Sequence, residues 1–512
     1  MRHDRSAVDC AIAHEVRAPG TTIAIMVTRA TMRMTRRRRS HGEVVSSPGA
    51  PYGSQSSSSR GFSSSVIPSS VALAALSPMR ADSLASMSPS VPTSSPGGLV
   101  RSLGVVGAVG IGLASMIGAG AFFVWAPASA AAGAGGLLVA LLVAAVVATL
   151  NAFSTTQLAM AHPVSGGAYA FGRRWVGPWW GFTAGWLFVT GKTASAAAIA
   201  SVAAAYLWPE ARTPLAVGLI VVFAALNMTG VRTTARVSLV IVSVVLTGLI
   251  GMLVAASAAP QPGGTELDLS LATPYGVVQA AALLFFAFAG YARMATLGEE
   301  VRDPRRTLPR AILLALSVVL ALYAVIELTL TSRLSSGALA ASTSPLAELL
   351  DPAWRPFIAV LAGVACLGSL MAILAGLSRT SLAMARERDL PGVLARVSPR
   401  THAPVVAEGV IAAVAIVIVL LLEPAQLVAA SSAAVLLYYA IAHLAVLRQE
   451  AEHRWQPRAV AVVGLLGCVL LVAALPWGSL LGTAVLLAVG LLLRLIAVRR
   501  GGAPPSRPQE DA

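Results

Sequence analysis

The feature that most constrains this chain is a series of long apolar segments that begins at Leu103. Each has about 20 residues, the length that a helix needs to cross the hydrocarbon core of a bilayer. Helices of this kind satisfy every backbone hydrogen bond internally, as lipid requires. The sequence therefore predicts an all-α polytopic membrane protein with about twelve transmembrane helices. The expected spans are residues 103–125, 131–156, 178–207, 214–229, 236–258, 274–298, 309–331, 356–385, 404–422, 425–447, 459–475 and 479–497.

The composition agrees with a membrane protein. Hydrophobic residues make up 56% of the 512-residue chain and charged residues 12%, against about 25% charged residues in a soluble domain. The formal net charge of +15 could suggest nucleic acid as a partner. However, the basic residues after the first hundred lie in short clusters between apolar segments, as loop charges of membrane proteins do. We expect the lipid bilayer as a partner, and no nucleic acid.

Residues 1–97 differ from the rest because they are rich in Ser, Arg and Pro. Such a segment cannot bury a core, so we expect disorder. It could be a regulatory or lipid-binding tail, or a dispensable extension with the true start nearer Met79 or Met87. The expected boundaries of the remaining parts are 98–447 for the transport core, 448–500 for two accessory transmembrane helices and 501–512 for a disordered C-terminal tail.

The charges between the spans alternate in kind along the chain. Loops on one side are rich in arginine, whereas loops on the other side contain few arginines. The positive-inside tendency then predicts that both termini are cytoplasmic and that the number of spans is even. The arginines of the first side are Arg101, Arg173, Arg174, Arg232, Arg236, Arg302, Arg305, Arg306, Arg310, Arg386, Arg388, Arg396, Arg400, Arg448, Arg454, Arg458, Arg494, Arg499 and Arg500. The other side carries Glu210, Arg212, Glu266, Asp268, Arg333, Glu348, Asp351, Arg355 and Glu423.

Two spans contain residues that interrupt a helix. Gly104–Trp125 holds six glycines, each of which costs a helix about 1 kcal/mol against alanine. We expect unwinding only at Met116–Gly120, and a packing role for the glycines of Gly104–Gly112. In the sixth span, Ala289-Gly290 follows an aromatic run. Because the first and sixth spans are five apart, the pattern predicts an inverted repeat of five helices plus five.

Split helices of this kind can bind a zwitterion. The N–H groups that begin a second half-helix suit a carboxylate, and the carbonyl groups that end a first half suit an ammonium group. The alternative is that the glycines only allow close helix packing. A dinucleotide-binding loop does not fit, because the glycines lie in a continuous apolar segment. The candidate substrate-binding residues are Met116, Ile117, Gly118, Ala119, Gly120, Phe286, Ala287, Phe288, Ala289 and Gly290.

Lys192 is the only lysine of the chain and lies within the third span. An ionisable residue inside the membrane is a functional candidate. We expect Lys192 to be the coupling residue, either as a protonation switch or as a fixed positive charge in place of a sodium ion. The alternative is a side chain that snorkels towards the membrane surface or bonds a structural carbonyl.

A group of charged residues follows the sixth span. Glu299, Glu300 and Arg302, with Arg379 in the eighth span, are candidates for an inner gate of ion pairs that opens and closes during transport. The alternative is a solvated loop, in which each ion pair contributes under about 1 kcal/mol. The neighbouring charges are Asp303, Arg305, Arg306 and Arg386.

Three motifs resemble amino acid permeases of the amino acid–polyamine–organocation superfamily, over about residues 98–447. They are the glycine-rich Gly110–Phe123, the segment Phe285–Ile312 with the sequence FFAFAGYARMATLGEEVRDPRRTLPRAI, and Ser378–Ala407. The resemblance implies the inverted-repeat transporter fold. It also implies that backbone groups of helices one and six bind the carboxylate and amine of an amino acid, while an aromatic residue of helix six gates the site. The matching positions are Ile117, Gly118, Ala119, Gly120, Phe286, Phe288 and Gly290.

Two positions depart from this family pattern. Tyr291-Ala292-Arg293 stands where many members have Phe-Asp after the glycine of helix six, which weakens the case for a cationic substrate. The fifth span lacks the lysine that takes the place of a sodium ion in some proton-coupled members.

These features predict a secondary active transporter that moves an amino acid across the cytoplasmic membrane, coupled to protons. An amino acid exchanger and a transporter of polyamines or cationic amino acids are alternatives, and so is a membrane amino acid sensor that transports nothing. A membrane enzyme would need a cluster of catalytic His, Asp, Glu or Ser residues, and the sequence has none that we recognise. We also expect no cofactor, metal or ATP hydrolysis, because the chain has neither a nucleotide-binding motif nor metal-ligand spacing.

Overall fold

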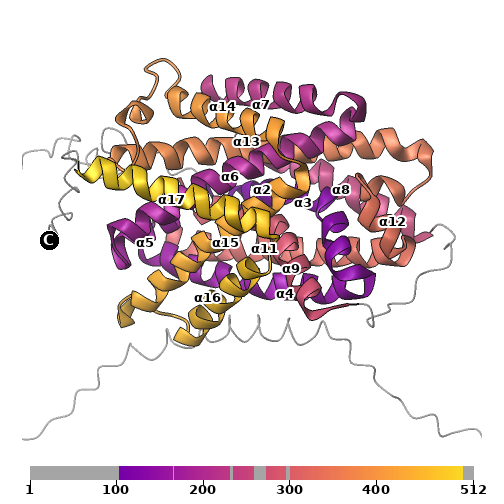
Figure 1. The fold of residues 1–512 in the computed structure, drawn as a ribbon, viewed down its shortest axis with the longest axis horizontal. Coiled ribbons are helices and arrows are strands. Elements are labelled where there is room, and N and C mark those ends of the chain that lie inside the picture. The colour runs from indigo at the N-terminus through magenta and orange to yellow at the C-terminus, as the bar shows by residue number, and fades with distance from the viewer. Residues whose placement is uncertain (1–102, 165, 231–234, 259–271, 296–299, 500–512) are drawn as a thin grey trace, which may run out of the picture. The chain divides into compact units, whose positions relative to one another are not determined.

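A computed structural model of the chain describes residues 103–164, 166–230, 235–258, 272–295 and 300–499 (Figure 1). These residues form helices and one isolated bridge between Leu103 and Val301, without any strand. The predictions for 1–97 and 501–512 lie outside the described residues. The α-helices are α2 Val105–Met116, α3 Ala119–Phe123, α4 Trp125–Ala161, α5 Ala168–Trp175, α6 Pro178–Leu207, α7 Arg212–Met228, α8 Ala235–Ala258, α9 Pro274–Phe288, α10 Ala292–Ala295, α11 Pro304–Arg333, α12 Ser336–Ala341, α13 Arg355–Arg386, α14 Val405–Leu421, α15 Pro424–Arg448, α16 Arg458–Ala473 and α17 Trp477–Arg499. The 3₁₀ turns are η2 Pro209–Ala211, η4 Ala289–Tyr291, η5 Pro345–Glu348, η6 Pro352–Trp354, η7 Gly392–Ala395 and η8 Ala451–His453.

The helices confirm the prediction of an all-α, multi-pass membrane protein. Within the described residues, nine helices are long and apolar enough to cross a membrane, and each overlaps a predicted span. The other three predicted spans coincide with the shorter apolar helices Val105–Met116, Val405–Leu421 and Arg458–Ala473. A helix of this length falls short of the roughly 30 Å of hydrocarbon by itself. The count of twelve spans therefore stays a prediction.

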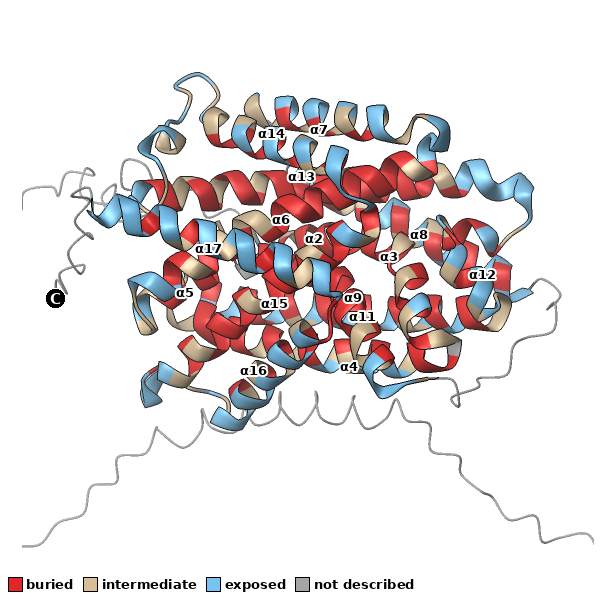
Figure 2. Cartoon of the chain, viewed as in Figure 1, coloured by how far each residue is buried: buried red, intermediate tan, exposed pale blue. Residues whose placement is uncertain are grey.

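Burial separates the central helices from the outer ones. Figure 2 shows α6 and α13 with long buried stretches, whereas α7, α14 and α17 expose much of their surface. The sequence of α6 is rich in Ala, Gly and Ser, and small residues let helix backbones approach closely in a membrane. The exposed faces of α7 and α17 carry Leu and Val side chains, which suit contact with lipid.

The ion pairs agree with the predicted sidedness of the loops. Arg173 in α5 pairs with Glu387 after α13, and Arg494 in α17 pairs with Asp389; these residues all belong to segments assigned to the arginine-rich side. At the other side, Arg212 pairs with Glu423. No ion pair among the described residues joins loops that were assigned to opposite sides.

Two glycines in the interior of α2 serve packing. A methyl group on Gly110 would lie 2.6 Å from Leu239 of α8, and one on Gly112 would collide with Met294 of α10. Gly104, at the start of α2, faces open space, so the packing role predicted for it is wrong. The close approach of α8 and α10 to α2 thus depends on glycines in the interior of the helix.

Candidate substrate site

The first predicted break lies within the expected stretch and is shorter than expected. Helix α2 ends at Met116, Ile117 and Gly118 have non-helical backbone angles, and α3 begins at Ala119. Gly118 has φ −151° and ψ −137°. A methyl group here would lie 2.6 Å from the Cβ of Ser369 in α13, so the close approach of α13 favours glycine at this position. Helix geometry leaves the N–H groups of Ala119 and Gly120, at the start of α3, without an intrahelical acceptor.

The second break lies at the end of α9. The helix ends at Phe288 and the chain continues as the 3₁₀ turn Ala289–Tyr291 before α10 begins. The carbonyl groups of this last turn carry partial negative charge. The two breaks thus present N–H groups on one helix and carbonyl groups on the other, as binding of a zwitterion requires.

Two glycines bring the breaks into direct contact. A methyl group on Gly120 would lie 2.5 Å from the Cα of Ala287, and one on Gly290 would collide with the carbonyl group of Ser115. The two breaks can lie against each other because neither glycine has a side chain, which is a packing role; a role of these glycines in substrate binding stays a prediction.

Tyr323 of α11 links the two broken helices. Its hydroxyl group lies 2.9 Å from the carbonyl oxygen of Met116 and 3.2 Å from that of Ala287, and its ring packs against Phe288 and Trp125. A phenol has one proton to donate, so the two carbonyl groups share it. The position of α11 therefore bears on the geometry of both breaks.

Lys192 lies at the second break. Its Nζ donates a hydrogen bond of 2.9 Å to the carbonyl oxygen of Ala289, and the side chain is buried. An ammonium group at the carbonyl end of a helix is electrostatically favourable. The side chain therefore does not snorkel. The bond to Ala289 is the kind of contact that the other alternative, a structural partner to a carbonyl group, describes, so the coupling role stays a prediction.

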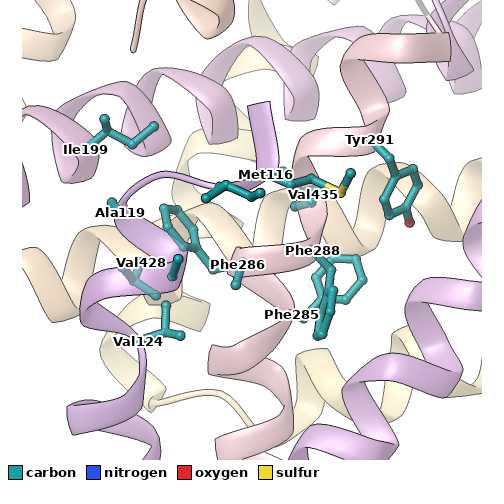
Figure 3. Packing of buried hydrophobic residues seen from close by; sticks show 14 of the residues in the cluster. Met116, Ala119, Val124, Ile199, Phe285, Phe286, Phe288, Tyr291, Val428 and Val435 are labelled. Carbon is teal, nitrogen blue, oxygen red and sulfur yellow. The ribbon is translucent and has the colours of Figure 1, made fainter. Parts of the chain in front are cut away.

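A small cavity lies between the breaks, α6 and α13. Its volume is about 10 Å³, which is room for about one water molecule. Figure 3 shows Phe286 directed towards Met116 and Ala119 at the first break, while Phe285 and Phe288 point to the opposite side of α9. The lining residues are Ser115, Met116, Ala119, Gly120, Lys192, Ser195, Ile199, Phe286, Gly290, Ser369 and Ile373.

The cavity contains some of the predicted substrate-binding residues and not others. Met116, Ala119, Gly120, Phe286 and Gly290 line it. The other predicted residues do not: Ile117, Gly118, Ala287, Phe288 and Ala289 are buried beside it. Ala289 still contributes its carbonyl group, through Lys192.

Several lining residues were missed. Ser195 and Ile199 follow Lys192 at the spacing that places residues on one face of a helix, so the lysine could have predicted them. Ser369 and Ile373 are likewise four residues apart, but no chemical signal in the sequence singles out this face of α13.

The predicted gate residues come together only in part. Arg379 of α13 forms an ion pair with Glu300. Backbone hydrogen bonds hold the segment of Glu300 against Leu103. The Leu103 N–H donates to the Glu300 carbonyl group at 3.0 Å, and the Arg302 N–H donates to the Leu103 carbonyl group at 2.8 Å. The side chain of Arg302 is exposed, and Glu299 lies outside the described residues. The inner gate stays a prediction.

A second charged cluster, which the sequence did not predict, surrounds Asp389. Its carboxylate accepts hydrogen bonds from Arg173 at 2.7 Å, from Arg494 at 2.7 Å and from Tyr169 at 2.9 Å. Burial and the neighbouring carboxylate raise the pKa of Tyr169, so its hydroxyl group remains a donor. The Asp389 cluster thus joins α5, the loop after α13 and α17.

A family profile and several relatives match this chain over most of its length. The profile of the amino acid permease family matches residues 107–508. A transporter of Mycobacterium tuberculosis (strain ATCC 25618 / H37Rv), described as uncharacterized, is 46% identical over 417 residues, which cover 80% of this chain and 94% of that protein.

More distant relatives carry functional descriptions. The branched-chain amino acid permease BcaP of Bacillus subtilis (strain 168) is 26% identical over 444 residues, covering 80% of this chain and 95% of that protein. The vacuolar cationic amino acid transporter 2 of Arabidopsis thaliana is 28% identical over 349 residues, covering 62% of this chain and 55% of that protein.

Proposed function

The chain belongs to the amino acid permease family of transporters, and from that premise we propose that it is a secondary active transporter which moves a neutral amino acid across the cytoplasmic membrane together with protons. The observation that carries the proposal is the meeting of two broken helices at a cavity that Lys192 lines. N–H groups of Ala119 and Gly120 would bind the substrate carboxylate. The carbonyl end of α9 would bind the amine.

The lining supports an apolar substrate side chain. Met116, Ile199, Phe286 and Ile373 supply hydrocarbon surface, and Lys192 is the one charged residue among the lining residues that the structure describes. A cationic side chain would have to lie beside this ammonium group without a carboxylate to offset the repulsion. The description of BcaP as a branched-chain amino acid permease agrees with an aliphatic substrate.

Lys192 is the proposed coupling residue. Its ammonium group bonds the Ala289 carbonyl, which is one of the groups proposed to receive the substrate amine. Substrate binding would therefore affect the hydrogen bond between Lys192 and Ala289, whether the lysine gives up its proton or stays as a fixed cation. Phe286 is the proposed aromatic gate of the cavity, with Glu300 and Arg379 as part of an inner gate.

We also propose the remaining organisation on the same basis. Residues 98–447 would form two inverted repeats of five helices, with α16 and α17 as accessory helices. The arginine-rich loops would face the cytoplasm, together with both termini.

Uptake into proteoliposomes tests the proposal. The purified chain is reconstituted and offered each of the twenty labelled amino acids, with and without an inward proton gradient. We expect uptake of one or more neutral aliphatic amino acids and an increase with the gradient. Uptake that ignores the gradient and requires amino acid inside the vesicle would indicate an exchanger.

Two results would contradict the proposed substrate class or the transport itself. Preferential uptake of arginine, lysine or a polyamine would favour a cationic substrate, as in the Arabidopsis relative. Tight binding of an amino acid without any uptake would indicate a sensor built on the transporter fold.

A further inference from the structure

We infer that Glu327 of α11 is a second proton-binding site, which binds and releases the coupling proton. The inference rests on the proposed function, because it concerns the same coupled transport. It assigns the proton to a residue outside the cavity.

Glu327 is a carboxyl group in an unusual setting. The residue has no exposed surface, and neither of its carboxyl oxygens has a hydrogen-bond partner among the residues that the structure describes. An ionised carboxylate is strongly disfavoured in such a place, whereas the neutral acid is tolerated. The carboxyl group therefore holds a proton in this conformation. Ionisation would require that water or a polar group reach it.

The charged neighbours do not change this conclusion. The helices α2, α4, α8, α10 and α12 and the turn η4 pack against α11. Their ionisable side chains within the described residues are Arg236 in α8, Tyr291 in η4 and Arg293 in α10. None of the three forms an ion pair with Glu327. On α11 itself, Arg333 donates to the carbonyl group of Ala256, and the hydroxyl group of Tyr323 bonds the two breaks.

The place of Glu327 on α11 connects it to the substrate site. Glu327 follows Tyr323 by four residues, so the two side chains lie on the same face of the helix, one turn apart. Tyr323 bonds Met116 and Ala287 at the two breaks. Any movement of α11 that hydrates Glu327 would also displace the Tyr323 hydroxyl group. Release of the proton is thereby linked to the geometry of the breaks.

The depth of Glu327 suits a proton that arrives from outside. Along α11, Glu327 lies about 9 Å from Arg333 and about 35 Å from Pro304. In the proposed orientation, the Arg333 end of α11 faces the extracellular side. A proton bound from that side and released after the transporter reorients would drive inward transport.

The test compares two kinds of transport in proteoliposomes that contain the full chain, with labelled leucine as the probe. Glu327→Gln keeps the size of the side chain and its neutrality. We expect it to lower the leucine accumulation driven by a proton gradient by about tenfold or more, as expected for the loss of a linkage between two sites. Exchange of leucine at equal pH should stay within about twofold of the wild type, because exchange needs no net movement of protons.

Glu408→Gln is the matched control. Glu408 of α14 is also buried, but its carboxylate accepts a hydrogen bond of 3.0 Å from Asn227. We expect this variant to keep the response to the gradient. An equal loss of the gradient response in both variants would overturn the inference. It would show that removal of any buried acid impairs transport.

The outcomes separate this inference from the proposed function. A wild type that ignores the proton gradient overturns proton coupling and the inference with it. A wild type and a Glu327→Gln variant that respond equally overturn the inference alone. If the Gln variant does not fold, Glu327→Asp decides: a proton site with a shortened side chain should change the pH dependence of accumulation, and an unchanged pH dependence overturns the assignment.

Discussion

At the scale of single residues, Lys192 connects α6 to the second break. It lies in the middle of α6, yet its Nζ contacts the carbonyl group of Ala289 in the turn η4. A charge-assisted hydrogen bond in a buried setting contributes about 1.5–3 kcal/mol. The lysine therefore stabilises the second break as well as lining the cavity.

Lys192→Met should weaken amino acid transport. Loss of the bond to Ala289 removes about 1.5–3 kcal/mol that stabilises the second break, so we expect a clear decrease in uptake. Leucine uptake into proteoliposomes, with and without a proton gradient, measures the change. Thr193→Val is the control, because the Thr193 hydroxyl group only bonds the carbonyl group of Val189 in its own helix. Unchanged proton-coupled uptake in Lys192→Met would eliminate the lysine as the coupling residue.

Gly290→Ala should disrupt the contact between the breaks. The added methyl group would collide with the carbonyl group of Ser115, and overpacking of this kind costs about 1–3 kcal/mol. We expect a lower temperature of thermal unfolding in detergent and loss of uptake. Gly218→Ala in α7 is the matched control, because a methyl group there meets no atom within 4 Å and should stabilise the helix by about 1 kcal/mol. Equal unfolding temperatures for the two variants would contradict the packing role of Gly290.

At the scale of helices, the Asp389 cluster connects α17 to α5 and to the loop after α13. Arg494 of α17 and Arg173 of α5 bond the two oxygens of one carboxylate, each at 2.7 Å. The side chains of Asp389 and Arg494 are 6% and 7% exposed, so the pair is buried. Breaking a buried pair leaves a charge without its partner and costs about 3–5 kcal/mol.

Asp389→Asn should therefore destabilise the packing of α5 and α17. We expect a decrease of about 3–5 kcal/mol in the free energy of unfolding, measured by denaturant titration in detergent micelles. Arg212→Gln breaks the exposed pair with Glu423 and should cost less than about 1 kcal/mol. Similar effects of the two substitutions would contradict the proposed difference between the buried and exposed pairs.

At the scale of the whole molecule, the distribution of arginine predicts the orientation in the membrane. Glu210, after α6, and Arg400, before α14, lie in exposed loops that were assigned to opposite sides. The ion pairs join loops of the same assigned side, which is the pattern expected if the alternation of spans is correct. The positive-inside tendency alone predicts which set of loops faces the cytoplasm.

Single cysteines at these two positions test the orientation. In a chain with Cys10→Ser, the remaining cysteines, Cys366 and Cys468, are buried. A maleimide that does not cross membranes should label Glu210→Cys in intact cells, and should label Arg400→Cys only after the cells are lysed. The reverse pattern would invert the proposed topology, and labelling of both in intact cells would contradict the assignment to opposite sides.

The sequence by itself predicted the membrane fold and the positions of the two breaks, and it singled out Lys192. These features are local: an apolar segment of about 20 residues needs a bilayer, glycine weakens a helix wherever it lies, and a single lysine in an apolar span is conspicuous in any context. Only the tertiary structure decided which side chains converge on the cavity, and it brought Tyr323 to the breaks and Arg494 to Asp389. Such contacts join helices that are distant along the chain, and they depend on how the helices pack, which the residue pattern of one helix does not specify.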